Sequence, residues 1–151
     1  NELPYDQRSS PSLLRKSILG LRGHMPSVAT NHYSGSFFLN PIIPNKLAGQ
    51  IRVKFPSILM RPFDGRHQQV ASGWLLEQSG LRSTRSNKFY FHENHANFVM
   101  NESSGATGKD LSDFIMSTQE IVYSKFGIQI VPEPLLVGEE FWRGNVFHQA
   151  K

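Results

Sequence analysis

The 151 residues include 16 Lys and Arg, 12 Asp and Glu and no cysteine, which gives a formal net charge of +4 at pH 7. This length predicts one domain with a sizeable core, and the absence of cysteine excludes disulfides and thiolate metal sites. The basic residues form no long run and no apolar run approaches the roughly 20 residues of a membrane span, so we expect a soluble protein without nucleic-acid or membrane partners, whose charge favours anionic ligands.

The first predicted element is a short amphipathic helix. Ser10 and Pro11 supply an N-cap and a first-turn proline. Apolar side chains then recur at helical spacing, namely Leu13, Leu14, Ile18 and Leu21. We expect residues 1–30 to be a lead-in helix and linker, with a loop over residues 23–32, and residues 31–138 to form the main domain.

Three further features are predicted in the middle of the chain. Residues 47–55 carry apolar side chains at helical intervals, and Pro56 stops this second helix. Residues 55–69 contain two prolines and little periodicity, which predicts a surface loop. Trp74–Gln78 predicts a third helix, because Gly80 follows as a residue that tolerates the left-handed backbone conformation.

The last third of the chain predicts two strands and the longest helix. Residues 89–91 and 98–100 are ring-rich apolar runs, a pattern typical of strands. The helix begins after Thr107, with Asp110 placed to complete a capping box, and ends before Gly127. The side chains expected on its buried face are Leu111, Phe114, Ile115, Thr118, Ile121, Val122 and Phe126.

The end of the chain adds short strand-like segments. Residues 128–131 and 135–137 flank a Pro-Glu-Pro triplet, and we expect residues 139–151 to form a loose tail. Helices and strands do not alternate regularly along the chain. The predicted fold class is therefore α+β, with a mixed or antiparallel sheet and packed helices.

The stretch Tyr33–Pro41 gathers groups that suit a binding site within a predicted strand. Gly35 lets a bound group approach the main chain, and two phenylalanines can anchor the segment so that Ser36 is held in place. Asn40 offers a donor and an acceptor just before a proline that fixes the backbone. Composition alone favours a simpler interpretation, a strand that ends in a turn.

His92 and His95, with Glu93 beside them, raise the question of a metal site, since imidazole is a common zinc ligand. The HExxH zinc motif places its histidines four positions apart on a helix, whereas these lie three apart beside predicted strands, and no third ligand is indicated. We therefore expect no metal and interpret the pair as solvated or ligand-facing. Glu133 lies between two prolines that restrict its backbone, although such a glutamate is more often simply exposed to solvent.

Four segments resemble, in order and at similar spacing, motifs of the UDP-N-acetylenolpyruvoylglucosamine reductases (MurB), the flavoenzymes of peptidoglycan synthesis. Residues 34–41 (SGSFFLNP) are similar to SGSFF-x-NP, and residues 73–81 (GWLLEQSGL) to GWLIEQAGL. Residues 92–101 (HENHANFVMN) are similar to a KHANFIVN-type strand, and residues 126–138 (FGIQIVPEPLLVG) to a closing FGI-x-L-x-PE-x-x-x-x-G motif. The resemblance is to the carboxy-terminal, substrate-binding domain of that family.

This resemblance implies an oxidoreductase that converts UDP-N-acetylglucosamine enolpyruvate to UDP-N-acetylmuramate in the cytoplasm, with FAD as cofactor, NADPH as reductant and no metal. It also implies a flavin-binding domain ahead of the SGSFF segment, in the same chain or as a separate one. We expect residues 31–138 of the present chain to hold the UDP-sugar substrate, and the chain to be inactive alone.

The resemblance also implies roles for individual residues. Ser36 matches the family's catalytic serine, which delivers a proton to the substrate, and Glu133 matches its catalytic glutamate. Asn40 and His95 match positions near the substrate. His24 stands where the family has a lysine that meets the substrate's phosphates.

Several positions depart from the family's pattern. Leu39 stands where Lys or Thr is usual, Gln69 replaces a second lysine, and the glycine pair before the KHANFIVN-type strand is absent. Basic residues that could compensate are Arg52, Lys54, Arg61, Arg66 and Arg82, of which Arg82 is our candidate for substrate binding. The alternative function is therefore a diverged, non-catalytic domain that keeps the fold and binds a nucleotide-sugar or a protein partner.

Overall fold

The computed structural model describes the chain in four stretches, residues 10–21, 32–85, 88–135 and 137–138. The chain divides into two compact units, Asn1–Thr30 and Asn31–Lys151. In the first unit the predicted helix is confirmed, because α1 (Pro11–Leu21) starts at the proline. Of the loop predicted over residues 23–32, residues 23–31 fall outside the described residues and His32 is instead the first residue of a strand, and the tail predicted over residues 139–151 also falls outside them.

The described residues of the second unit form two antiparallel three-stranded sheets and three α-helices. Its elements in chain order are β1 (His32–Ser36), β2 (Ile42–Pro44), α2 (Asn45–Lys54), β3 (Met60–Pro62), β4 (His67–Val70), α3 (Ser72–Gln78), the 3-10 helix η2 (Leu81–Ser83), β5 (Phe89–His92), β6 (His95–Asn101) and α4 (Gly108–Phe126). The strand orders are β1-β6-β5 and β2-β4-β3. The predicted α+β class is confirmed.

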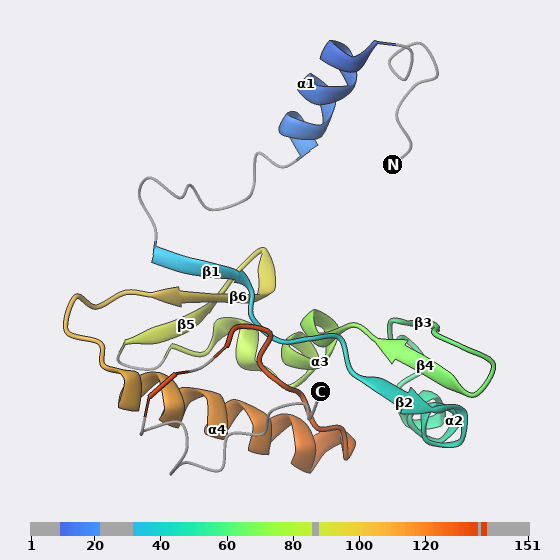
Figure 1. The fold of residues 1–151 in the computed structure, drawn as a ribbon. Helices are drawn as coiled ribbons and strands as arrows, with labels where there is room; N and C mark the ends of the chain where they lie inside the picture. The colour runs from blue at the N-terminus through green and yellow to red at the C-terminus, as the bar shows by residue number, and fades with distance from the viewer. Residues whose placement is uncertain (1–9, 22–31, 86–87, 136, 139–151) are drawn as a thin grey trace. The chain divides into compact units, whose positions relative to one another are not determined.

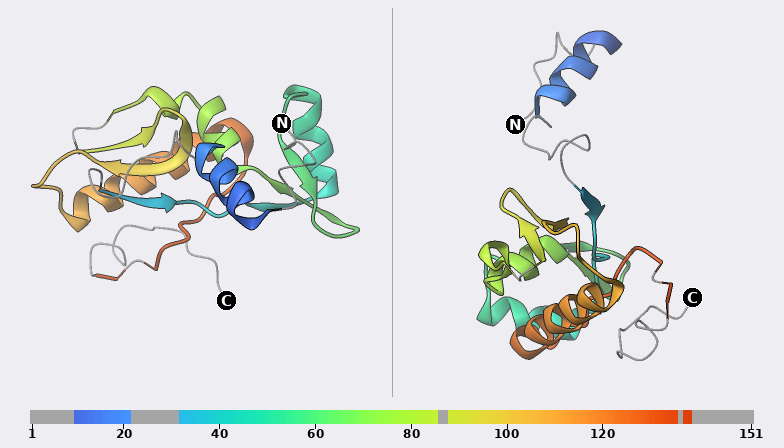
Figure 2. Two further views of the ribbon diagram at one scale, coloured as in Figure 1. Left: turned by 90° about the horizontal axis from the view of Figure 1, so that it is seen from above. Right: turned by 90° about the vertical axis from the view of Figure 1, so that its left-hand side faces the viewer.

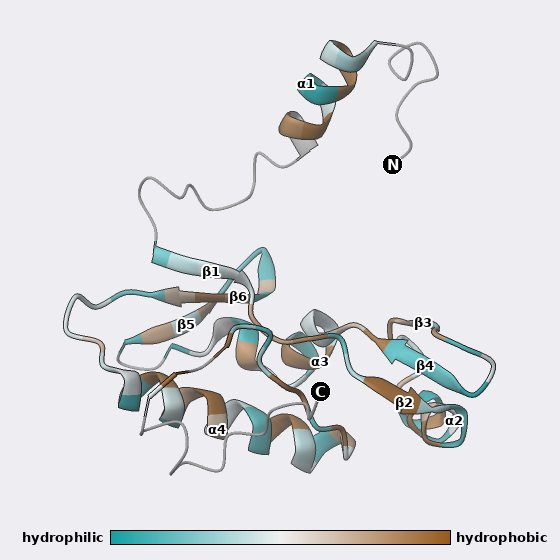
Figure 3. Cartoon of the chain, viewed as in Figure 1, coloured by the Kyte–Doolittle hydropathy of each residue, from teal (hydrophilic) through white to brown (hydrophobic). Residues whose placement is uncertain are grey.

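The core lies where α4 and α3 pack against the sheet of β1, β6 and β5 (Figures 1 and 2). Phe89 and Phe91 on β5 meet Phe114 on α4, with ring centroids 5.8 and 5.1 Å apart. Leu75 and Leu76 on α3 are fully buried. Apolar and polar positions recur along α4 in Figure 3, as expected of a helix with one face on a core. None of the described helices is long and apolar enough to cross a membrane.

The prediction of a surface loop over residues 55–69 is wrong, because β3 and β4 pair there as a hairpin and β2 completes the sheet. Each strand is only three or four residues long and contains proline or glutamine where an alternating apolar pattern would be recognised. At the turn, the Asp64 carboxylate accepts hydrogen bonds from the N–H groups of Arg66 at 2.7 Å and His67 at 2.8 Å. The bond from Arg66, followed by that from the His67 ring, lowers the pKa of Asp64.

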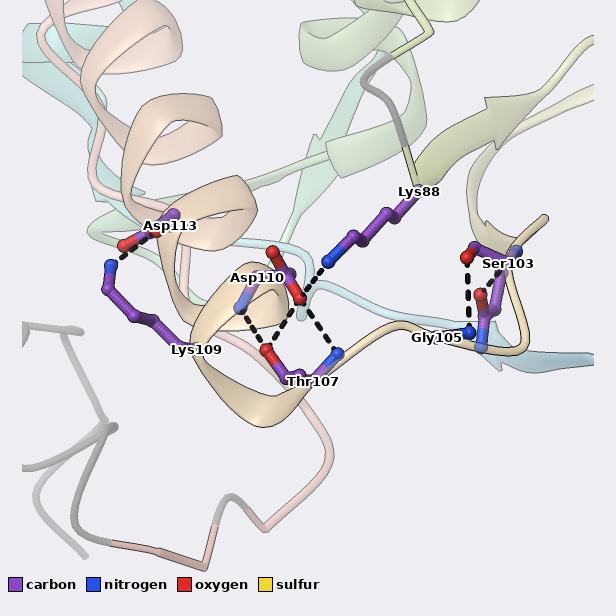
Figure 4. Close-up of polar contacts among 8 residues, drawn as sticks. Lys88, Ser103, Gly105, Thr107, Lys109, Asp110 and Asp113 are labelled. Carbon is purple, nitrogen blue, oxygen red and sulfur yellow. Dashed lines mark hydrogen bonds and ion pairs between the residues drawn. The ribbon is translucent and has the colours of Figure 1, made fainter.

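The N-terminus of α4 carries the predicted capping box (Figure 4). Asp110 N donates to Thr107 Oγ1 at 3.2 Å, and Thr107 N donates to the Asp110 carboxylate at 2.8 Å. Lys88 Nζ donates to the same carboxylate at 2.6 Å. Lys88, followed by the hydroxyl and N–H of Thr107, holds the pKa of Asp110 well below its usual range. At its other end α4 stops before Gly127, as predicted, and the φ of this glycine is 66°, in the left-handed region.

One residue of the predicted buried face of α4 is placed wrongly by the sequence pattern. Ile115 and Val122 are fully buried, but Ile121 is 39% exposed. Gln119 is buried instead, at 3% exposed, and its amide nitrogen donates to the carbonyl of Ile130 at 2.9 Å. A polar residue with a hydrogen-bonding partner can therefore occupy the core face, which a pattern of apolar residues does not reveal.

The segment after α4 forms no regular strand among its described residues. Phe38 and Pro132 make an isolated antiparallel bridge. Farther along the chain, the side chains of Leu135 and Val137 are 89% and 77% exposed. The strand predicted over residues 128–131 is therefore wrong. Residues 135 and 137 are not in a strand either, while residue 136 lies outside the described residues. The prolines between the two segments lack the N–H groups that a continuous ladder needs.

Candidate functional site

The chain leaves β1 at Ser36 and turns into the core. Phe37 and Phe38 are 3% and 1% exposed, and their rings meet edge to face with centroids 5.1 Å apart. Gly35 has a φ of 74°, a left-handed conformation that glycine tolerates best. The two rings anchor the segment as predicted, and Ser36 is exposed at the end of the strand.

Asn97 takes the place of a strand partner for Phe38. Its Oδ1 accepts from Phe38 N at 2.9 Å, and its Nδ2 donates to Phe38 O at 2.8 Å. The same Nδ2 donates to Ser72 Oγ at 2.9 Å. Neither Asn97 nor Ser72 is among the predicted site residues. One indication of Asn97 was present in the sequence: it is a polar residue within residues 92–101, the segment that resembles a KHANFIVN-type strand.

Asn40 is oriented by Ser72 at the start of α3. Asn40 Oδ1 accepts from Ser72 N at 2.9 Å and from Ser72 Oγ at 3.0 Å. A backbone N–H can only donate, so the oxygen of the amide must face Ser72 and the NH₂ group must face away. That NH₂ group donates to no other described residue, and Asn40 is exposed. The amide is therefore held by one end and available to a ligand at the other.

Ser36 and Glu133 come from segments that are far apart in the sequence and adjacent in the fold. Glu133 N donates to Phe37 O at 2.8 Å, and Leu39 N donates to Val131 O at 2.9 Å. These bonds flank the bridge described above and align the two segments antiparallel. Ser36 and Glu133 are both exposed. Their catalytic roles stay predictions.

His92 and His95 form one end of a ladder of stacked rings. The centroids are 5.6 Å apart for His92 and His95, 5.0 Å for His95 and Phe98, and 5.5 Å for Phe98 and Tyr33. Asn94 N donates to His92 Nδ1 at 3.1 Å. Burial, followed by the charge of His95, lowers the pKa of His92. Within the described part of the chain, no three His, Cys, Asp or Glu side chains gather as a metal site requires.

The remaining predicted substrate contacts are not brought to Asn40 by any described interaction. Arg82 forms an ion pair with Glu77 and donates to the carbonyl of Glu93. His95 lies beside Phe98, the register partner of Ser36, rather than beside Asn40. His24 lies outside the described residues.

A cavity of about 250 Å³ opens beside Asn40. Its lining consists of Asn40, Leu59, Met60, Arg61, Gln69, Val70 and Ala71. Two of its polar members contact each other, since Arg61 Nε donates to Gln69 Oε1 at 2.8 Å. The arrangement can bind a small group that accepts hydrogen bonds and carries negative charge.

The chain is similar to proteins named UDP-N-acetylenolpyruvoylglucosamine reductase. The one from Chromobacterium violaceum is 29% identical over 131 residues, 86% of this chain and 38% of that protein. The one from a Psychrobacter species is 32% identical over 144 residues, 89% of this chain and 37% of that protein. The one from Porphyromonas gingivalis is 31% identical over 131 residues, 85% and 38% respectively. The chain thus spans less than two-fifths of the length of these relatives.

The domain profile described as the C-terminal domain of UDP-N-acetylenolpyruvoylglucosamine reductase matches residues 27–137. That stretch contains the described segments that position Ser36, Asn40 and Glu133. Because the match extends over most of the sequence, the resemblance is confirmed, and the chain belongs to the MurB C-terminal domain family.

Proposed function

We propose that this chain supplies the substrate-binding and proton-donating part of a UDP-N-acetylenolpyruvoylglucosamine reductase of peptidoglycan synthesis. The observation that carries the proposal is the backbone pairing of residues 37–39 with residues 131–133. This pairing supports a shared site for Ser36 and Glu133, both of which are exposed. The relatives' name supports a substrate that joins a UDP-sugar to an enolpyruvyl group.

Ser36 is the proton donor in this proposal. When bound, FAD reduced by NADPH supplies the hydride for the enolpyruvyl double bond. The carbon next to the site of hydride addition, and its carboxylate, then carry developing negative charge. A serine hydroxyl is a weak acid in water, but it can protonate such a strongly basic carbon when held within hydrogen-bond reach. Ser36 directly precedes Phe37 and Phe38, whose burial fixes the main chain and limits the movement of that hydroxyl.

Glu133 and Asn40 have supporting roles. Glu133 has proline on both sides, which restricts the direction of its carboxylate, and we assign it to orient the proton source or tune the enol. Asn40 is held through its oxygen, so its NH₂ group donates to the substrate. Donors fixed in advance near developing negative charge contribute several kcal/mol in a site that excludes water.

The test uses Ser36→Ala in a reductase that carries this chain together with a flavin-binding part. Hydride transfer precedes protonation, so flavin reoxidation followed by stopped flow should change only modestly. Turnover should fall on the order of 10²-fold or more, because the proton donor is missing. Ser34→Ala, two residues earlier on β1 and also exposed, is the matched control and should turn over at the parent rate. If Ser36→Ala also turns over at the parent rate, the serine is merely structural, and that result would favour the alternative of a diverged, non-catalytic domain.

A further inference from the structure

The basic residues that could bind an anionic substrate lie in different places in the structure. Arg82 is paired with Glu77. Lys54 lines a different groove of about 360 Å³, between α2 and the end of α4. Arg61 lines the cavity beside Asn40, and it is the charged residue among the described groups of that lining.

The guanidinium of Arg61 is oriented by a neutral side chain and not by a carboxylate, so no ion pair with a described residue compensates its charge. Arg61 and Gln69 are cross-strand partners on β3 and β4, and the bond from Arg61 Nε to Gln69 Oε1 fixes the plane of the guanidinium. Gln69 is neutral, whereas Arg82, Arg85 and Lys88 each form an ion pair with a carboxylate. The two Nη atoms of Arg61 have no partner among the described residues. They remain available as a pair of charged donors, the arrangement that matches two oxygens of one phosphate.

The rest of the cavity suits one anionic group of a larger ligand. Its apolar walls are Leu59, Met60, Val70 and Ala71. The volume of about 250 Å³ is below the roughly 300–1,000 Å³ of pockets that enclose a whole ligand. The cavity therefore fits a diphosphate or a comparable group rather than an entire nucleotide-sugar.

We propose that Arg61 binds the diphosphate of the UDP-sugar substrate, together with the amide nitrogen of Asn40. The identity of the ligand rests on the proposed function, whereas the affinity for an anion follows from the cavity itself. Gln69 is a positioning residue that aims the guanidinium. The positive charge of the site is supplied from the β3 strand of the hairpin.

Calorimetric titration of the 151-residue chain tests this, with UDP as the anionic probe and uridine as its uncharged counterpart. Arg61→Gln should weaken UDP binding about 10- to 100-fold, the range expected for a charged hydrogen bond, and should leave uridine binding unchanged. Arg66→Gln removes the same charge from the same hairpin but not from the cavity lining, so it should change UDP binding less than about twofold. Gln69→Glu should weaken UDP binding as well, because it would neutralise Arg61 in an ion pair.

Several results would overturn the proposal. These are UDP affinity unchanged in Arg61→Gln or in Gln69→Glu, equal losses in Arg61→Gln and Arg66→Gln, or no UDP binding by the parent chain. Titration with N-acetylmuramate, which has a carboxylate and no diphosphate, identifies the group. If Arg61→Gln weakened the binding of N-acetylmuramate but not that of UDP, the proposal would also be contradicted. Arg61-dependent UDP binding combined with an unaffected Ser36→Ala variant would remove the proposed function and leave the anion site standing.

Discussion

At Phe38 a single side chain meets both hydrogen-bonding needs of a buried main chain, and truncating Asn97 tests its contribution. Asn97→Ala leaves Phe38 N without its partner and leaves Phe38 O with Ser72 Oγ, which donates to it at 3.1 Å. We expect the free energy of unfolding to fall by about 1–3 kcal/mol, the cost of leaving a buried polar group unsatisfied. Urea denaturation measures it. Asn94→Ala, in the exposed turn between β5 and β6, is the control and should change stability by less than about 0.5 kcal/mol. Equal losses in both variants would contradict the assigned role.

The residues of the candidate site were predictable to different degrees. Ser36, Asn40 and Glu133 belong to motifs, and the chemistry of a hydroxyl, an amide and a carboxylate singles them out. Asn97 and Ser72 were not predicted, because Asn97 meets Phe38 59 positions away and Ser72 meets Asn40 32 positions away. No local pattern contains such pairings. Arg61 was one of five basic candidates until the hairpin placed it beside Gln69.

At the scale of elements, two isoleucines of α4 offer a matched comparison. Ile115 is fully buried and Ile121 is 39% exposed. Ile115→Ala should lower the free energy of unfolding by about 2–5 kcal/mol, because it removes buried methyl groups and leaves a cavity. Ile121→Ala should cost less than about 1 kcal/mol, since alanine also has the better helix propensity. Thermal unfolding followed by circular dichroism ranks the two. Similar losses would show that the face assigned here to the core is wrong.

Elements with strong local signals were the ones predicted correctly. The capping box of Thr107 and Asp110 and the left-handed Gly127 delimit α4 without help from the rest of the fold. The hairpin of β3 and β4 has no such signal, because residues 42–44 supply its third strand and its own strands are rich in proline and glutamine. The strand predicted just before the Pro-Glu-Pro triplet failed for a related reason, since the two prolines of the triplet cannot donate the hydrogen bonds that would continue it.

At the scale of the whole molecule, the chain alone should not act as a reductase. It corresponds to 37–38% of the length of its relatives from Chromobacterium and Psychrobacter, and its candidate residues are all assigned to the sugar nucleotide. After incubation with FAD and gel filtration, the purified chain should lack the visible absorbance band of a flavin and should not oxidise NADPH. A retained band, or NADPH oxidation that depends on the enolpyruvyl substrate, would contradict this expectation. Retained binding of UDP by the same sample serves as its positive control.

The pairing of Phe38 with Pro132 has a consequence for how the site is maintained. It joins residues about 94 positions apart, and closing a flexible loop of that length costs on the order of 4 kcal/mol in chain entropy. The two backbone hydrogen bonds beside the bridge return only about 1 kcal/mol each, so they do not hold the segments together unaided. The packing of α4 against the sheet supplies the remaining free energy. The two segments are therefore paired only while the whole unit is folded, and any core substitution that lowers stability also raises the fraction of molecules in which they are apart.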